Sequence, residues 1–126
     1  MIWYGLDGKP TTAEAANVLL GDELARRVAH TTIVTDKGRV TVSTVFLVLD
    51  HSHGGPVPVL WESMAFGGPV DNDARRYTSA QDAVEGHAEM VALVKAELEM
   101  DGAVILAEET FDGAAARRVG STTEES

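Results

Sequence analysis

The feature that most constrains the fold is a long apolar stripe in the second half of the chain. Between residues 79 and 100, apolar side chains and one histidine recur at alternating spacings of three and four, the period of one α-helical face. The stripe consists of Ala80, Val84, His87, Val91, Val94 and Leu98. Thr78 and Gln81 match a capping box before it, and Gly102 suits the left-handed residue that follows a helix. The pattern predicts one long helix with a face that the rest of the chain must cover.

Segments with strand character lie on both sides of this helix. Residues 28–35 are rich in β-branched side chains, and residues 39–50 follow them after a tight turn. Residues 57–66 form a third predicted strand, and residues 67–73 form a Gly- and Asp-rich loop. Residues 103–107 form a short last predicted strand. This order predicts an α+β fold, with an antiparallel three- to four-stranded meander packed against the long C-terminal helix.

The ends of the chain complete the predicted domain. Thr11 and Glu14 match a capping box, which predicts a short N-terminal helix ending near Leu20. We expect a single domain over residues 1–112. Residues 113–126 are small, polar and acidic at their end, which is typical of a disordered tail.

The composition limits the cellular setting. The chain of 126 residues has no cysteine, so disulfides, thiolate catalysis and cysteine-based zinc or iron–sulfur sites are excluded. The start of the chain lacks the pattern of a secretory signal, and the longest apolar run, Val45–Leu49, is far too short to span a membrane. We therefore expect a soluble protein in a reducing, intracellular setting.

The charge limits the kind of partner. There are 20 acidic and 10 basic residues, giving a net charge of −10. This disfavours binding to a phosphate backbone, which requires clustered Lys and Arg. Attraction to a basic partner, mimicry of nucleic-acid charge and simple solubility all remain open.

Two ionisable residues on predicted packing faces are candidate catalytic groups. Glu62 shares one face of its strand with Leu60, Met64 and Phe66, because strand side chains alternate. If that face is the core, Glu62 must be paired or protonated; if the face of Trp61 is the core, Glu62 is exposed. His87 lies within the helical stripe. It is either a satisfied core histidine or the partner of Glu62 in an acid–base pair.

A loop after the second strand holds the candidate metal ligands Asp50, His51 and His53. His-x-His can present two imidazoles to one ion, and Glu62 or His87 could complete a Zn²⁺, Mn²⁺ or Fe²⁺ site. The motif also occurs by chance, and the two glycines that follow it favour a mobile loop. No sequence motif indicates an organic cofactor, so a divalent metal is the one cofactor considered.

Three of the few aromatic residues are candidate partner-binding residues: Trp3, Tyr4 and Trp61. They either pack in the core or, if exposed together, mark a surface for a protein partner.

The middle of the chain carries a family resemblance. The segments Val42–His51, Leu60–Gly68 and Arg76–His87 resemble a group of small uncharacterised proteins of tailed bacteriophages, prophages and their bacterial relatives. Those proteins commonly have glycine where this chain has Val48, and Phe-Glu-Thr in place of the residues at 61–63. The resemblance implies a phage-encoded accessory protein, located in the host cytoplasm or in the virion. The bias toward Ala, Val, Gly and Asp/Glu suits an actinobacterial host.

Three functions are compatible with these observations. The first is binding of a host or virion protein, without catalysis. The alternative is a small metal-dependent or acid–base enzyme that uses Asp50, His51, Glu62 and His87, and the second alternative is an acidic nucleic-acid mimic. Direct nucleic-acid binding and membrane association are not expected, whereas a homo-oligomer is compatible with the sequence.

Overall fold

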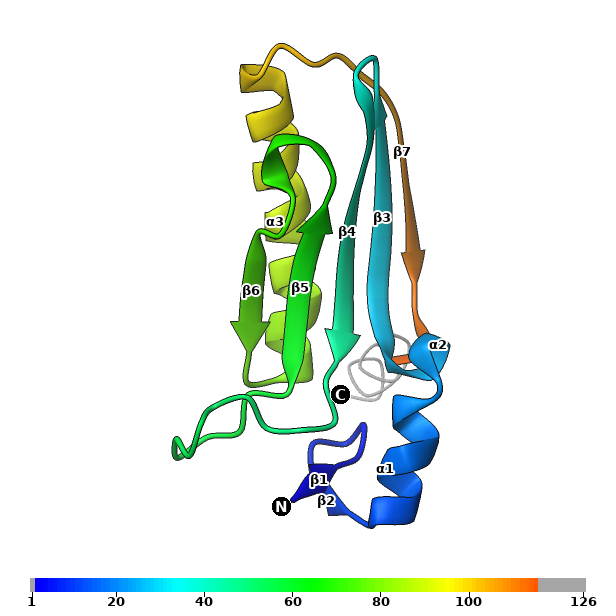
Figure 1. The fold of residues 1–126 in the computed structure, drawn as a ribbon, viewed down its shortest axis with the longest axis vertical. Coiled ribbons are helices and arrows are strands. Elements are labelled where there is room, and N and C mark those ends of the chain that lie inside the picture. Colours follow the sequence, from blue (N-terminus) through cyan, green and yellow to red (C-terminus); the bar gives the residue numbers. More distant parts are fainter. Residues whose placement is uncertain (1, 116–126) are drawn as a thin grey trace, which may run out of the picture.

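The computed structural model describes residues 2–115 and has mixed helix and strand (Figure 1). In chain order, its elements are β1 (Trp3–Tyr4), β2 (Pro10–Thr11), α1 (Ala13–Leu20), α2 (Glu23–Arg26), β3 (Arg27–Thr35), β4 (Gly38–Phe46), β5 (Trp61–Phe66), the 3₁₀ helix η1 (Gly68–Val70), β6 (Ala74–Tyr77), α3 (Ala80–Met100) and β7 (Ile105–Asp112). None of the helices in this part of the chain is long and apolar enough to cross a membrane.

The main sheet has five antiparallel strands in the order β6-β5-β4-β3-β7. Helix α3 lies across one face of this sheet, and α1 and α2 lie beyond one end of it (Figure 1). The predicted α+β fold, with an antiparallel meander against a long C-terminal helix and a short N-terminal helix, is confirmed. The helix starts are each one residue later than the capping boxes predict, because Thr12 and Ser79 supply the capping oxygens.

Four strands of the sheet differ from the prediction. Strand β5 begins at Trp61 rather than at residue 57, because its pairing with β4 and β6 begins there. Residues 74–77 form β6, a strand that was not predicted because its two arginines interrupt any apolar pattern. Pairing with β5 stabilises it. Strand β7 extends to Asp112 rather than 107, because it pairs along β3 from Thr35 to Ala29. Strand β4 ends at Phe46 rather than at residue 50, since the chain then turns through Val48, whose φ is 71°.

Alternation along the strands decides which side chains meet α3. The inner face carries Thr31 and Ile33 of β3, Val42, Thr44 and Phe46 of β4, and Trp61, Ser63 and Ala65 of β5, all of them buried. From α3, the side chains of His87, Met90, Val94 and Leu98 pack onto this face and are also buried. The outer face of the sheet is not covered by any helix of the described chain (Figure 1).

The chain stays packed slightly beyond the predicted domain boundary. The backbone N–H of Gly113 donates to the Val28 carbonyl at 2.8 Å, and Ala115 is 6% exposed. A Cβ at Gly113 would overlap the carbonyl of Arg27, so only glycine fits there. Residues 113–115 therefore belong to the domain rather than to a tail, and the rest of the predicted tail, residues 116–126, lies outside the described residues.

Candidate functional site

A chain of hydrogen-bonded side chains crosses the interface between α3 and the sheet. Its first half starts at Tyr77 on β6, where Oη donates to Ser63 Oγ on β5 at 3.0 Å. Ser63 Oγ is 2.5 Å from Thr44 Oγ1 on β4, and Thr44 Oγ1 is 2.6 Å from Nδ1 of His87 on α3. Ser63 and Thr44 are fully buried, so each hydroxyl needs a protein partner.

The second half of this hydrogen-bond chain runs from His87 toward the opposite edge of the sheet. His87 Nε2 is 2.8 Å from Thr31 Oγ1 on β3, and Thr31 Oγ1 is 2.8 Å from Thr110 Oγ1 on β7. The chain therefore takes one side chain from each of the five strands and one from the helix. Only Thr110 among its members is exposed.

The direction of these hydrogen bonds follows from counting protons. Ser63 accepts from Tyr77, so its own proton goes to Thr44, the other hydrogen-bond partner that it has among the described residues. Thr44 then donates to Nδ1 of His87, and the ring proton lies on Nε2 and is donated to Thr31. The reverse direction would leave the Ser63 proton buried without an acceptor, which costs about 1–3 kcal/mol.

This assignment leaves one donor at the end of the chain. Thr31 donates to Thr110, and no acceptor for the Thr110 hydroxyl proton lies among residues 2–115, so within this part of the protein that proton is available to a ligand. Both ring nitrogens of His87 are occupied by hydroxyl groups, and neither presents a free lone pair.

His87 is neutral at physiological pH. Its pKa is lowered from 6.5 to about 4, first because burial disfavours the charged ring, then because the His30 ring repels it when both are protonated, with Asp112 acting in the opposite direction. A neutral ring is what the hydrogen-bond chain requires, since one nitrogen must accept a proton and the other must donate one.

The Tyr77 hydroxyl gives a direct test of this chain. We expect Tyr77→Phe to lower the free energy of unfolding by about 1 kcal/mol, because it removes a buried donor but leaves Ser63 bonded to Thr44. Urea unfolding measures the change. The same substitution at Tyr4, which is buried but does not belong to the hydrogen-bond chain, is the control. It should lower the free energy of unfolding by less than about 0.5 kcal/mol. Equal losses at both positions would contradict the role given to Tyr77.

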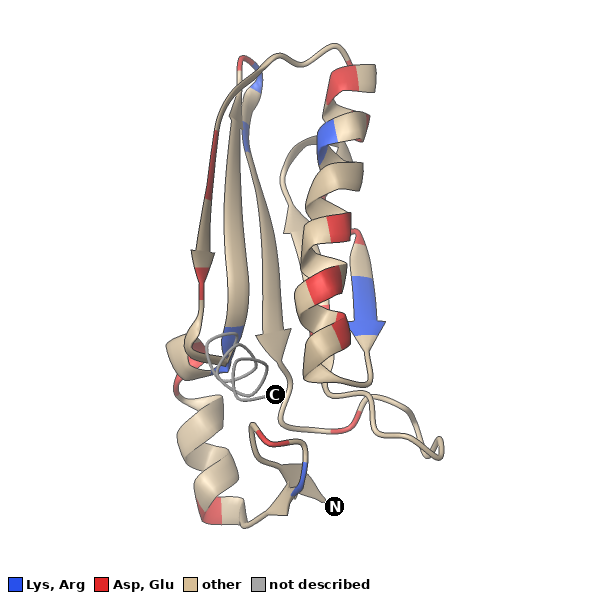
Figure 2. Ribbon diagram, turned by 180° about the vertical axis from the view of Figure 1, so that it is seen from behind, with Lys and Arg blue, Asp and Glu red and all other residues tan. Residues whose placement is uncertain are grey.

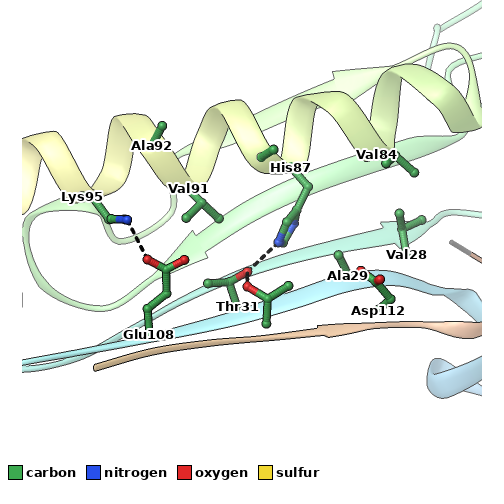
Figure 3. Close-up of a pocket in the computed structure, with 12 residues that line it drawn as sticks. Val28, Ala29, Thr31, Val84, His87, Val91, Ala92, Lys95, Glu108 and Asp112 are labelled. Atoms are coloured by element: carbon green, nitrogen blue, oxygen red, sulfur yellow. Dashed lines mark hydrogen bonds and ion pairs between the residues drawn. The ribbon is translucent and has the colours of Figure 1, made fainter. Parts of the chain in front are cut away.

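The end of the chain at Thr110 opens into a groove between α3 and β7 (Figure 3). The groove has a volume of about 410 Å³. The close-up shows His87 and Thr31 pointing toward each other on its floor, with Lys95 and Glu108 facing each other across one end. Lys95 Nζ and the Glu108 carboxylate are 2.7 Å apart. The remaining walls are mostly aliphatic: Val28, Ala29, Val84, Ala88, Val91 and Ala92.

The acid–base pair of Glu62 and His87, one of the two possibilities for these residues, does not form. Glu62 is on the outer face of β5 and its carboxylate accepts from Nε of Arg76 on β6 at 2.9 Å, whereas His87 packs against the inner face. The reason is that the alternate set of β5, which contains Trp61 and Ser63, faces the core. The two candidate catalytic residues are thus separated by the sheet, and the alternative of a satisfied core histidine describes His87.

The candidate metal ligands lie together around a second hollow, but Asp50 and His51 are held by other interactions. Asp50, His51 and His53 line this hollow with Tyr4. The Asp50 carboxylate accepts from the backbone N–H groups of Val59 and Ser52, which holds its pKa below the usual range. His51 Nδ1 is 2.8 Å from the Leu49 carbonyl. Within residues 2–115, no group of three or more His, Asp or Glu side chains is arranged to hold a metal ion.

The candidate aromatic surface is part of the core. Tyr4 is 8% and Trp61 is 4% exposed, and the half-buried Trp3 packs against the same cluster. The Trp61 ring contacts Phe46, with ring centroids 5.3 Å apart. These residues are therefore not an exposed partner-binding surface, and core packing, the other possibility for them, describes their position.

Sequence patterns did not indicate that the edge strand β7 is open to a further strand among the described residues. All of its residues except Ile105 are exposed, including Leu106 and Phe111 at 63% and 58%. It is long and contains no proline or lysine, the residues that commonly protect sheet edges. The opposite edge strand, β6, is only four residues long and carries two arginines.

The backbone of β7 alternates between bonding to β3 and facing outward. Because Gly113 N–H bonds to Val28, the two-residue period of an antiparallel ladder turns Phe111, Glu109 and Ala107 toward β3. The backbone N–H and C=O groups of Glu108, Thr110 and Asp112 therefore point away from the sheet. The sequence does hold one signal for this edge: residues 108 and 109 are acidic, although the segment around them is strand-like.

No protein-family model, no curated protein and no solved structure matches this chain. The geometry of the described residues is accordingly the basis for assigning a function.

Proposed function

We propose that this protein is a phage-encoded accessory protein that acts by binding another protein, and that the partner adds an extended segment to β7 as a further strand. The observation that carries the proposal is the unprotected edge of β7, in which three successive outward residues, Glu108, Thr110 and Asp112, offer backbone donors and acceptors. In strand addition, the backbone hydrogen bonds supply affinity and the alternating side chains supply specificity.

The charge of β7 supports a basic partner. The strand carries Glu109 and Asp112 beside Glu108, whose charge is neutralised by Lys95, and it appears as acidic bands along one edge of the molecule in Figure 2. Cross-strand neighbours of opposite charge stabilise a sheet, and like charges placed directly opposite destabilise it. A partner segment with Lys or Arg opposite these positions is therefore favoured.

The same charges disfavour a second copy of this chain on β7. When the β7 strands of two copies pair around a two-fold axis, the side chains of residues that lie opposite each other are on the same face of the sheet. Two registers meet this condition and pair almost the whole strand. One places Glu108 opposite Glu108, and the other places Glu109 opposite Glu109. Because both registers bring carboxylates together, the proposed partner is a different protein, of the host or of the virion.

The backbone at Val48 supports the relation to phage proteins. Val48 is fully buried with φ at 71°, a conformation that is unusual for a β-branched residue and free of strain for glycine. Glycine is the residue that the resembling phage proteins commonly have at this position. The local conformation is thus the one expected for a relative in which valine has replaced glycine.

We expect Thr110→Pro to abolish capture of the partner and Thr110→Val to preserve it. Proline removes the outward N–H and the strand-pairing geometry at the centre of the edge, whereas valine removes only the hydroxyl group. The measurement is affinity capture by the tagged full-length protein from lysate of infected host cells and from disrupted virions. Both variants are first checked for a native circular-dichroism spectrum.

A charge reversal gives the matched control. Glu109→Lys is expected to weaken capture, while Glu97→Lys, an identical charge change on the exposed side of α3, is expected to leave it unchanged. A partner that is retained by Thr110→Pro, or lost equally with both charge reversals, would contradict strand addition at β7. Failure of the wild-type protein to capture any specific protein would contradict the proposed function itself.

A further inference from the structure

The groove between α3 and β7 has the dimensions of a small-molecule site. Its volume of about 410 Å³ falls within the range of roughly 300–1,000 Å³ that is typical of ligand pockets. One wall is the side of α3 that carries Val84, Ala88 and Val91, and the other is formed by β3 and β7. The small side chain of Ala88 is exposed and leaves room above the floor.

The polar groups of the groove are arranged asymmetrically. Lys95 and Glu108 neutralise each other across one end and so offer no free charge to a ligand. Asp112 stands at the other end and repels anions. Between them, the Thr110 hydroxyl is the donor left over from the buried chain that starts at Tyr77.

We propose that this groove binds a small uncharged molecule with an apolar body and a carbonyl or ether oxygen that accepts a hydrogen bond from Thr110. The apolar body lies against Val84, Ala88 and Val91, where it removes aliphatic surface from water. The acceptor oxygen completes the hydrogen-bond chain, because Thr110 already accepts from Thr31 and has one proton to donate. Hydrogen bonds in this chain polarise one another, which strengthens the donor at its end.

The groove is distinct from the edge of β7, where the partner strand is proposed to bind. The groove uses inward-facing side chains, whereas strand addition uses outward-facing backbone groups. Thr110→Val separates the two: it preserves capture of the protein partner and weakens binding of the small molecule. Either proposal can therefore fail without the other.

The test uses three soluble probes that share a phenylethyl body: the neutral ketone 4-phenyl-2-butanone, the 3-phenylpropanoate anion and the 3-phenylpropylammonium cation. Binding is followed by the backbone amide signals of Ala88 and Thr110 in nitrogen–proton NMR spectra. We expect the ketone to bind in the millimolar range, as suits its size, and more tightly than either ion. Thr110→Val should weaken the ketone about five-fold, the equivalent of one hydrogen bond, and leave the two ions unchanged.

Location is tested by a matched pair of tryptophan substitutions on α3. Ala88→Trp places an indole over the groove and should abolish the ketone-induced shifts, while Leu93→Trp, at a position that is 58% exposed and outside the groove, should not affect them. Equal ketone affinity in the wild type and in Thr110→Val would overturn the proposal. So would tighter binding of the cation than of the ketone, or the same effect of both tryptophans.

Discussion

Replacing Gly86 with alanine is expected to lower the free energy of unfolding by about 3 kcal/mol, although the same change in an exposed helix stabilises a protein by up to about 1 kcal/mol. The reason is the position of Tyr77. A Cβ at residue 86 would overlap the tyrosine ring at Cε1, Cζ and Oη. The ring cannot withdraw easily, because it is 9% exposed and its hydroxyl is bonded to the buried Ser63.

A double-mutant cycle separates this overlap from a general effect on α3. Urea unfolding of the single variants Gly86→Ala and Tyr77→Ala is compared with unfolding of the double variant. Without the tyrosine ring, Gly86→Ala should be neutral or stabilising. If Gly86→Ala lowers the free energy of unfolding equally with and without the Tyr77 ring, the loss is not caused by the close packing of β6 under the helix.

Acidification is the second condition with a large expected effect. The pKa of His87 is about 4 in the folded protein and 6.5 in the unfolded chain, so the unfolded chain binds more protons between these values. The contribution of His87 to stability is fully present above pH 6.5 and decreases as the pH falls toward 4. The loss should reach about 3 kcal/mol at pH 4.

His87→Gln isolates this contribution from the carboxylates that also titrate. Glutamine can donate and accept hydrogen bonds but has no charged form, so the variant should be less stable at pH 7 and should approach the wild type as the pH falls to 4. The unfolding free energies of both proteins, measured by urea titration at each pH, give the difference curve. If the unfolding free energies of the two proteins fall in parallel between pH 6.5 and 4, protonation of His87 does not destabilise the folded protein.

Periodicity was sufficient to predict the helix and most of the sheet. The stripe from Ala80 to Leu98 indicated α3, because an apolar period of 3.6 residues over many turns is specific to an amphipathic helix. The β-branched segments indicated β3 and β4, because such side chains pack well on a pleated sheet. Strand β6 was hidden because Arg75 and Arg76 interrupt any apolar pattern, and only their pairing with β5 makes the segment a strand.

The candidate site could be predicted only in part. His87 was recognised from its place in an apolar stripe, but its partners are hydroxyl groups that lie 43 and 56 residues away in the sequence. Threonine and serine are ordinary strand residues, so nothing in the sequence distinguishes Thr44 or Thr31 from their neighbours.

The two possibilities left open for Glu62 have a clear physical origin. Both alternating sets of residues on β5 contain apolar side chains, and the set with Glu62 includes several large ones. The structure instead turns Trp61 inward, where it contacts Phe46, and leaves Glu62 beside Arg76 on the outer face. Which face of a strand is buried depends on the neighbouring strands and helix, and a single strand does not contain that information.

The most direct test of strand addition at β7 is amide hydrogen exchange along that strand, measured by NMR in the free protein and in the complex with the captured partner. The free protein should show slow exchange at Ala107, Glu109 and Phe111, which bond to β3, and fast exchange at Glu108, Thr110 and Asp112. In the complex, the fast set should become slow while the rest of the sheet is unchanged. Continued fast exchange at Glu108, Thr110 and Asp112 in a fully formed complex would contradict strand addition, because the partner would then be bound at another surface.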